Sequence, residues 1–199
     1  MSDTALLSTT DRRAATDSPL LGVLADRWSP RGFDADASID EVKLASALEA
    51  ARWSPSANNS QPWRFIVARR GTGEFDSIVL NLRGFNREWA ERAGALVVAV
   101  AETETADGTP VHFAAYDLGQ AMAHFSVQAH HDGLHVHQMG GIEREGLSAA
   151  FGLESRFVPL TVTAVGTLGG VESLSDAVQE RESAPRVRRP LAESVVLSA

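Results

Sequence analysis

Two nearly uninterrupted apolar runs constrain the fold of this chain most strongly. They are GALVVAVAE, residues 94–102, and VPLTVTAVG, residues 158–166. Both are short and rich in β-branched residues, which is typical of strands. A strand that is apolar at nearly every position suits burial on both faces, as in a sheet with helices on either side. We therefore expect a central sheet between helical layers.

Further elements follow from periodicity. RFIVAR (64–69) and SIVLNL (77–82) are predicted strands because they too are short and β-branched. A helix is predicted over residues 39–53, because Ser38 and Glu41 have the spacing of a capping box. Its apolar positions recur at helical spacing, which predicts a core face made of Val42, Ala45, Leu48 and Ala51.

The longest predicted helix lies within residues 109–134 and ends near Gly133. Its near-helical apolar spacing, with few polar interruptions elsewhere, predicts a largely buried helix with the core positions Leu118, Met122, Phe125 and Ala129. Residues 141–153 predict a shorter helix. Because helices alternate with strands, the fold class is α/β or α+β.

Charge and composition narrow the possible functions. The formal net charge of −8 is spread along the chain, so neither nucleic acid nor an anionic membrane is an expected partner. The absence of cysteine excludes disulfides, thiolate zinc sites, iron–sulfur clusters and a cysteine nucleophile. With no apolar run long enough for a membrane span, the expected location is the cytoplasm.

The first residues differ in character from the rest. Ser, Thr, Asp and Arg dominate as far as Asp17, which predicts a flexible arm over residues 1–18, with a docking segment as the alternative. Residues 19–199 are then expected to form a single domain without repeats.

Several stretches carry side chains able to bind a ligand. DRWSPRGF places Arg27, Ser29 and Arg31 at alternate positions, and RVRRPL forms a second basic cluster near residue 188. Both clusters are equally compatible with a solvated surface. The motifs G-x-G-x-x-G, G-x-x-x-x-G-K-[ST], H-E-x-x-H and G-x-S-x-G are all absent.

Four histidines crowd into HHDGLHVH, residues 130–137. Histidines two apart in a strand share one face, so a metal site is one interpretation. Their spacing matches no standard ligand pattern and no carboxylate partner is evident, so we predict no metal and favour core or solvated histidines.

The polar stretch RWSPSANNSQPWRF, residues 52–65, joins a predicted helix to a predicted strand. It has more Ser, Asn and Gln than a short turn requires. These residues bond readily to nearby backbone, so a capping turn is one explanation. The resemblance below provides another.

Taken in order, these stretches resemble the FMN-dependent nitroreductase family. The family pattern opens with an Arg-x-Ser-x-Arg stretch, here residues 27–31, and continues through a helix to a segment like S-P-S-x-x-N-x-Q-P-W, here residues 54–63. A long helix containing YDLG, the glycine loop QMGGI (138–142), PLTVTAVG and RVRRPL follow in the same order. The likeness covers about residues 24–196. It implies a nitroreductase-like fold with a mostly antiparallel central sheet, helices on its faces and termini exchanged within a dimer.

The resemblance also implies a set of FMN-binding residues. The contacts to the phosphate and to the polar edge of the ring or ribityl chain fall on Arg27, Trp28 (through its backbone), Ser29 and Arg31. Arg186 and Arg188 match a basic pair that reaches the phosphate. The polar stretch is expected to contact the same flavin from the second subunit, through Pro55, Ser56, Ala57, Asn59 and Gln61.

Met139, Gly140 and Gly141 match the loop whose backbone N–H lies near flavin N5. Familiar members of the family carry an acidic residue before this glycine, whereas this chain has Gln138 and Met139, so its nicotinamide preference is left open.

The implied activity is an FMN-dependent NAD(P)H oxidoreductase that reduces nitroaromatic, quinone or similar small acceptors by a ping-pong mechanism, as a homodimer with FMN at the interface. No catalytic acid or base is assigned, because the cofactor carries the chemistry. Two alternatives stay open. One is a flavin-binding sensor or carrier without turnover. The other is a different reaction of the superfamily, such as dehalogenation, dehydrogenation or flavin fragmentation.

Overall fold

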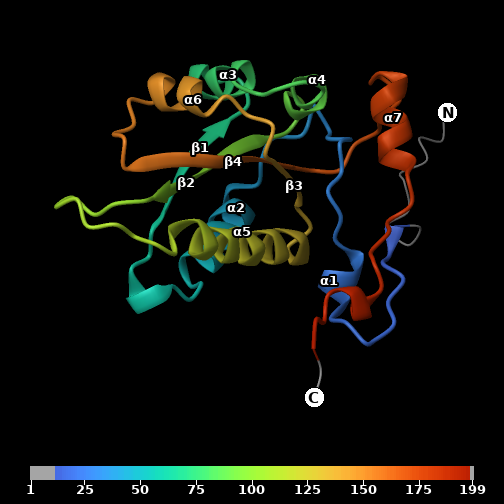
Figure 1. Cartoon of the computed structure of the whole chain (residues 1–199). Helices are drawn as coiled ribbons and strands as arrows, with labels where there is room; N and C mark the ends of the chain where they lie inside the picture. Colours follow the sequence, from blue (N-terminus) through green and yellow to red (C-terminus); the bar gives the residue numbers. More distant parts are fainter. Residues whose placement is uncertain (1–11, 198–199) are drawn as a thin grey trace.

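The computed structural model describes residues 12–197 and contains one four-stranded sheet (Figure 1). Its strands are β1 (Trp63–Arg69), β2 (Ala95–Glu102), β3 (His135–Met139) and β4 (Phe157–Gly166), in the spatial order β1-β2-β4-β3. All three pairings are antiparallel. The predicted mostly antiparallel sheet is confirmed, and three of the four predicted strands lie where expected.

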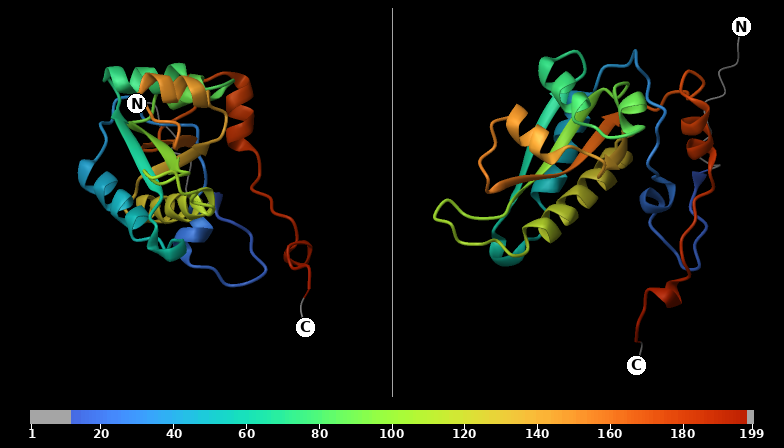
Figure 2. Two further views of the ribbon diagram at one scale, coloured as in Figure 1. Left: turned by 60° about the vertical axis from the view of Figure 1, so that its left-hand side comes forward. Right: turned by 45° about the horizontal axis from the view of Figure 1, so that its top comes forward.

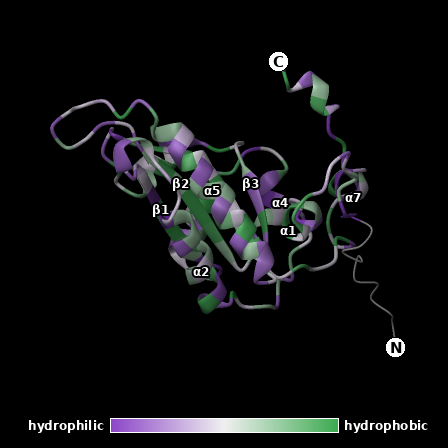
Figure 3. Ribbon diagram, turned by 90° about the horizontal axis from the view of Figure 1, so that it is seen from below, coloured by the Kyte–Doolittle hydropathy of each residue, from purple (hydrophilic) through white to green (hydrophobic). Residues whose placement is uncertain are grey.

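Helices cover both faces of the sheet. On one face lie α3 (Gly73–Leu80), α4 (Asn86–Ala90) and α6 (Arg144–Ala150), and on the other lie α2 (Glu41–Arg52) and α5 (Ala114–His131) (Figure 1). Figure 3 shows the apolar strand β2 behind α5.

Strand β2 is buried on both faces, as its sequence predicts. Leu96, Val98 and Val100 join the core beneath α3, while Val97 and the alternating alanines join the core beneath α5. Successive side chains of a strand point to opposite faces, so each core needs apolar residues at alternate positions. Complete burial of one such aliphatic side chain contributes roughly 1.5–3 kcal/mol. The continuous apolar run is therefore the signature of a two-sided core.

The predicted helix is confirmed as α2, but its expected capping box and half of its expected core face are wrong. The N-cap is Asp40, whose side chain accepts from the backbone N–H groups of Val42 and Lys43, and the expected box between Ser38 and Glu41 does not form. Of the four predicted core positions, Ala51 is buried and Leu48 packs against the core, whereas Ala45 is exposed and Val42 is 77% exposed. The other buried positions are Leu44 and Ala47. Apolar residues recur at helical spacing on both faces of this helix, so periodicity alone did not show which face is buried.

The prediction of a strand over residues 77–82 is also wrong, because this stretch belongs to α3 and the turn after it. Thr72 caps the helix by accepting from the N–H of Phe75 at 3.2 Å. Phe75, Ile78 and Leu82 then bury one face, a spacing that fits a helix. Tertiary packing overrides the local preference of β-branched residues for strands.

The long helix is confirmed as α5, with Leu118, Met122, Phe125 and Ala129 all buried. It ends before Gly133, whose φ of 83° lies in the left-handed region that favours glycine. The shorter predicted helix is α6.

The terminal segments lie together beyond the β3 edge of the sheet. They contain α1 (Gly22–Asp26), α7 (Asp176–Ser183) and the short 3₁₀ helix η3 (Leu191–Glu193) (Figures 1 and 2). The last described residues extend away from the body of the molecule (Figure 2). Exchange of termini within a dimer remains a prediction.

Of the predicted arm, residues 1–11 lie outside the described part of the chain, and the N–H of Ala14 donates to Ala25 O at 2.9 Å. Between residues 12 and 197, no helix combines the length and apolar character needed to cross a bilayer.

Candidate functional site

The segment after α1 supplies the first group of predicted site residues. The chain leaves α1 in extended conformation at Arg27, so successive side chains alternate in direction. Trp28 is buried at 5% exposure, whereas Arg27 and Ser29 on either side face a cavity of about 270 Å³. Arg31, expected to point the same way, lines neither this cavity nor the next. Its guanidinium lies 3.8 Å from the buried carboxylate of Glu182 in α7.

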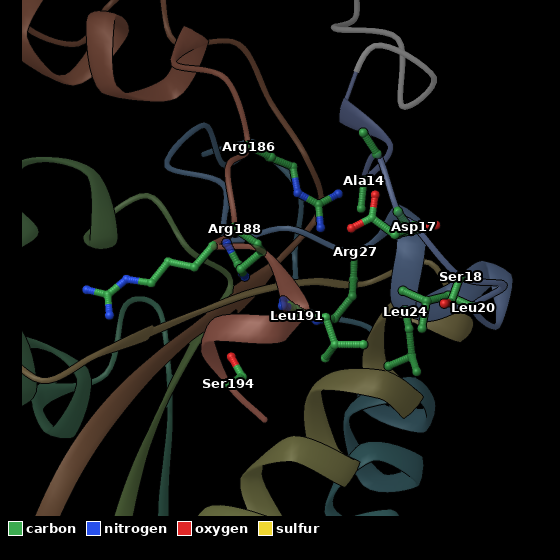
Figure 4. Close-up of a pocket in the computed structure, with 13 residues that line it drawn as sticks. Ala14, Asp17, Ser18, Leu20, Leu24, Arg27, Arg186, Arg188, Leu191 and Ser194 are labelled. Carbon is green, nitrogen blue, oxygen red and sulfur yellow. The ribbon is translucent and has the colours of Figure 1, made fainter. Parts of the chain in front are cut away.

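Arginines from both ends of the chain meet at a second cavity of about 400 Å³ (Figure 4). Arg27 comes from the segment after α1, and Arg186, Arg188 and Arg189 come from the segment after α7. The rest of the lining consists of Leu24, Leu191, Ser194 and parts of residues 14–20, including Asp17. The two basic clusters of the sequence therefore converge, an outcome that spacing alone left undecided.

The pKa values of two of these arginines show how the charges interact. Burial, followed by repulsion from Arg188, lowers the pKa of Arg27. Burial also lowers the pKa of Arg186, with repulsion from Arg27 and Arg188 adding to it. Arg186 is held in place because its guanidinium donates to Ala25 O at 2.8 Å and to Arg12 O. A group of guanidiniums that repel one another is suited to binding a multiply charged anion.

The smaller cavity continues from the arginines towards α5 and β3, and it shares Leu24 and Arg27 with the larger one. Its wall contains Gln138, whose amide donates to Ser126 Oγ at 2.9 Å and to Met122 O at 3.2 Å. The remaining lining residues are Ser29, Ala123, Ser126, Val127 and Val136. Sequence reasoning missed the contributions of Ser126 and Val136, because on α5 and β3 they look like ordinary core positions.

The glycine loop begins directly after Gln138. The side chain of Met139 is buried in the core, so only its backbone is available to a ligand. Gly140 has open space where a Cβ would stand. Gly141 is packed tightly, since an added Cβ would lie 3.0 Å from Asn86 Nδ2. These three residues directly follow Gln138, which lines the smaller cavity, but none of the three lines it.

The polar loop between α2 and β1 has an unusual backbone. Asn58, Asn59 and Gln61 have φ angles of 55°, 54° and 48°, a left-handed conformation that asparagine tolerates but that is uncommon for glutamine. The loop is held by Asp117 of α5, which accepts from Ala57 N at 3.0 Å, and by Ser56 Oγ, which accepts from Gln61 N at 3.0 Å. Such backbone strain persists only where the surroundings fix it, and it concentrates at functional sites.

Within one chain, this loop lies apart from the arginines. Pro55, Ser56 and Ala57 line a third hollow of about 280 Å³ beside Phe113 and Tyr116, at the start of α5. Ser126, at the arginine side, is more than two helical turns further along α5 than Asp117, roughly 14 Å along the axis. The structure therefore brings together Arg27, Ser29, Arg186 and Arg188, but not the residues of the loop.

The histidines pack against the Arg27–Arg31 segment. His137 Nδ1 donates to Pro30 O at 2.9 Å, and the ring of His135 lies 5.2 Å from that of Trp28. Burial lowers the pKa of both histidines to about 4. Among residues 12–197, no three side chains of His, Asp or Glu gather as a metal site. The arrangement gives these two histidines a structural role behind the cavity.

Comparison with known proteins agrees with this geometry. Residues 24–77 match the model of the nitroreductase family. A Mycolicibacterium smegmatis protein, described as a 15.4 kDa protein in the ask 5′ region, is 37% identical over 135 residues, covering 64% of this chain and 90% of that protein. An oxygen-insensitive NAD(P)H nitroreductase of Salmonella typhimurium is 28% identical over 192 residues, covering 74% of this chain and 88% of that protein.

A solved structure described as an oxidoreductase containing FMN has a TM-score of 0.85 to this chain at 33% identity. The match covers 92% of this chain and 93% of that one. The fold is the α/β fold of these relatives, and this chain belongs to the nitroreductase family. The family membership predicted from the motifs is confirmed.

Proposed function

We propose that this protein is an FMN-dependent NAD(P)H oxidoreductase that acts in the cytoplasm and reduces nitroaromatic, quinone or similar small organic acceptors. The observation that carries the proposal is the convergence of Arg27, Arg186 and Arg188 on one cavity that continues past Ser29 to Gln138. The names of the relatives, which include an FMN-containing oxidoreductase and an NAD(P)H nitroreductase, support the same function.

The residues present fit FMN. A phosphate dianion requires several cationic donors, and the guanidiniums of the larger cavity outnumber its one carboxylate, Asp17. The smaller cavity offers the Ser29 hydroxyl and the Gln138 amide beside apolar side chains, a combination suited to the sugar chain and a ring edge. Both hydrogens of the Gln138 amide are used within the protein, so its oxygen is the group that accepts from a ligand N–H.

A homodimer completes the proposed site. The loop residues Pro55, Ser56, Ala57, Asn59 and Gln61 do not reach the arginines of their own chain, so we assign them to the cofactor of the partner subunit. Their strained, well-anchored backbone supports a binding role in preference to a simple turn.

FMN held by these residues would supply the redox chemistry, accepting a hydride from NAD(P)H and passing electrons to the acceptor. The chain neutralises the phosphate with its arginines and fixes the cofactor with Ser29, Gln138 and the loop after β3. An acceptor that occupies the place vacated by the nicotinamide gives a ping-pong reaction. No side chain of this chain is assigned as a proton donor or acceptor.

Steady-state oxidation of NADH and of NADPH, with a small quinone or a nitroaromatic as acceptor, tests the proposal. We expect turnover with parallel lines in double-reciprocal plots. Arg27→Ala is expected to weaken FMN binding roughly 10- to 100-fold, because a hydrogen bond to a charged group contributes roughly 1.5–3 kcal/mol. Arg144→Ala, an exposed arginine of α6, is the matched control and keeps wild-type binding.

Two results would contradict the proposed activity. A protein that holds FMN but oxidises neither nicotinamide would be a carrier or sensor. A protein that oxidises NAD(P)H but releases halide, a dehydrogenated ring or flavin fragments would catalyse another reaction of the family. Product analysis separates these outcomes.

A further inference from the structure

Glu182 is a buried carboxylate in the last turn of α7, with 2% of its surface exposed. Acidic side chains are almost never fully buried unless they are paired. Its two oxygens have separate partners. Oε1 accepts from Trp28 Nε1 at 3.3 Å, and Oε2 accepts from the backbone N–H of Arg31 at 2.8 Å and lies 3.8 Å from the Arg31 guanidinium. One carboxylate thus holds both ends of the segment from Trp28 to Arg31.

The held segment carries the first side of the proposed phosphate site. Trp28 separates Arg27 from Ser29, and both of these neighbours line the smaller cavity. Fixing the indole of Trp28 inwards turns its two neighbours outwards, because side chains alternate along extended backbone. The contact with Glu182 therefore sets the direction in which Arg27 points.

The chain after Glu182 carries the second side. Arg186 and Arg188 follow shortly after Glu182 in the sequence. They line the larger cavity together with Arg27. Arg186 is also bound to Ala25 O, next to the start of the Arg27 segment. Glu182 thus connects the two segments whose guanidiniums surround one cavity.

The rear of the held segment allows little movement. His137 donates to Pro30 O at 2.9 Å. Behind the segment, Gly32 lies so close to the chain after β4 that an added Cβ would approach Gly169 O to 2.4 Å. β3 and the chain after β4 therefore fix one side of the segment. The contacts with Glu182 of α7 fix its other side.

We propose that Glu182 is a positioning residue for phosphate recognition, which holds Arg27 against Arg186 and Arg188 so that the site prefers FMN to riboflavin. The inference rests on the proposed function, since it assigns the anion as the FMN phosphate. A carboxylate is suited to this position because both of its oxygens accept hydrogen bonds, whereas an amide would present N–H groups to one of the donors.

The experiment compares FMN and riboflavin affinities of the flavin-free full-length protein by quenching of flavin fluorescence. The variants are Glu182→Gln, Trp28→Phe, which removes the indole donor together with part of the buried ring, and Glu180→Gln, an exposed acid on the same helix that serves as the matched control. Circular dichroism monitors folding, and amide hydrogen exchange monitors protection of residues 28–32.

We expect Glu182→Gln to weaken FMN binding at least tenfold, to leave riboflavin binding within threefold of wild type, and to increase exchange in residues 28–32. Trp28→Phe is expected to change the FMN preference in the same direction by a smaller factor and to carry the test if Glu182→Gln does not fold. Glu180→Gln is expected to match the wild type.

An unchanged FMN preference in the folded variants would overturn the role of Glu182 while leaving the proposed function intact. An equal loss of FMN and riboflavin affinity would also overturn it, because a merely structural residue gives that result. A wild-type protein that binds neither flavin would contradict the proposed function and this inference together.

Discussion

His135 is a histidine whose ring nitrogens, both buried, have no hydrogen-bond partner within the described part of the chain. Its neighbours are the rings of Trp28 and His130, at 5.2 and 5.4 Å between centroids. His137 also lies behind the cavity but donates to Pro30 O. Burial disfavours the charged imidazolium in both, so the pKa falls to about 4 in each. Their different partners give them different tolerance to substitution.

This burial predicts a specific loss of stability in acid. The folded pKa of about 4 lies below the ordinary value of 6.5, so the unfolded chain binds more protons between these pH values. The contribution of His135 is complete above about pH 6.5 and is lost as the pH falls towards 4. Its size is on the order of 3 kcal/mol. Thermal melts from pH 7 to pH 4 measure it.

His135→Phe removes this dependence without breaking a hydrogen bond. We expect the variant to be as stable as the wild type at pH 7 and to lose less stability on acidification. His131→Phe, at the exposed end of α5, serves as the control and keeps the wild-type slope. An unchanged slope in His135→Phe would show that His135 is not the group responsible.

Among the elements, sequence reasoning located the strands that are buried on both faces of the sheet. It did not identify the buried face of a helix that has apolar residues on two faces. Strands β2 and β4 were predictable because nearly every position is apolar. The correct face of α2 was not, because Val42 and Leu44 both begin an apolar series and only tertiary contact selects the second. Glu182 was not predictable either, since its partners Trp28 and Arg31 are 154 and 151 residues away in the sequence.

The cap of α2 gives a direct test at this scale. Asp40→Ala removes the side chain that accepts from Val42 N and Lys43 N, so we expect the free energy of unfolding to fall by about 1 kcal/mol. Ser38→Ala, at the position first expected to cap the helix, is predicted to change it by less than about 0.5 kcal/mol. Urea denaturation of both variants shows which residue caps the helix. A larger loss of stability in Ser38→Ala than in Asp40→Ala would favour the capping box of Ser38 and Glu41.

At the scale of the whole molecule, one chain exposes features that a partner subunit is suited to cover. Trp53 at the end of α2 is 73% exposed and Tyr116 on α5 is 67% exposed. Val196 and Leu197 near the C-terminus are almost fully exposed to solvent. Aromatic side chains are enriched at protein interfaces, and Tyr116 lines the same hollow as Pro55, Ser56 and Ala57. The loop that follows Trp53 is the one assigned to the partner's cofactor, so the proposed dimer accounts for the exposure and for the incomplete site together.

Mixed dimers test this shared site. A subunit carrying Arg27→Ala is paired with one carrying Asn59→Gly, which removes the loop side chain but keeps the left-handed backbone. If arginines and loop come from different subunits, each mixed dimer has one intact site and one doubly altered site. Half of the wild-type high-affinity FMN sites are then expected to return, whereas a site within one chain would leave every site defective.

The visible absorption spectrum of the purified protein tests FMN binding without any assumption about the acceptor. After release of the chromophore by heat, chromatography identifies it and gives the stoichiometry. We predict a yellow protein with one FMN per subunit. An Arg27→Ala, Arg186→Ala double variant is expected to contain no FMN after purification. A colourless wild-type protein that also fails to bind added FMN would contradict the proposed FMN site.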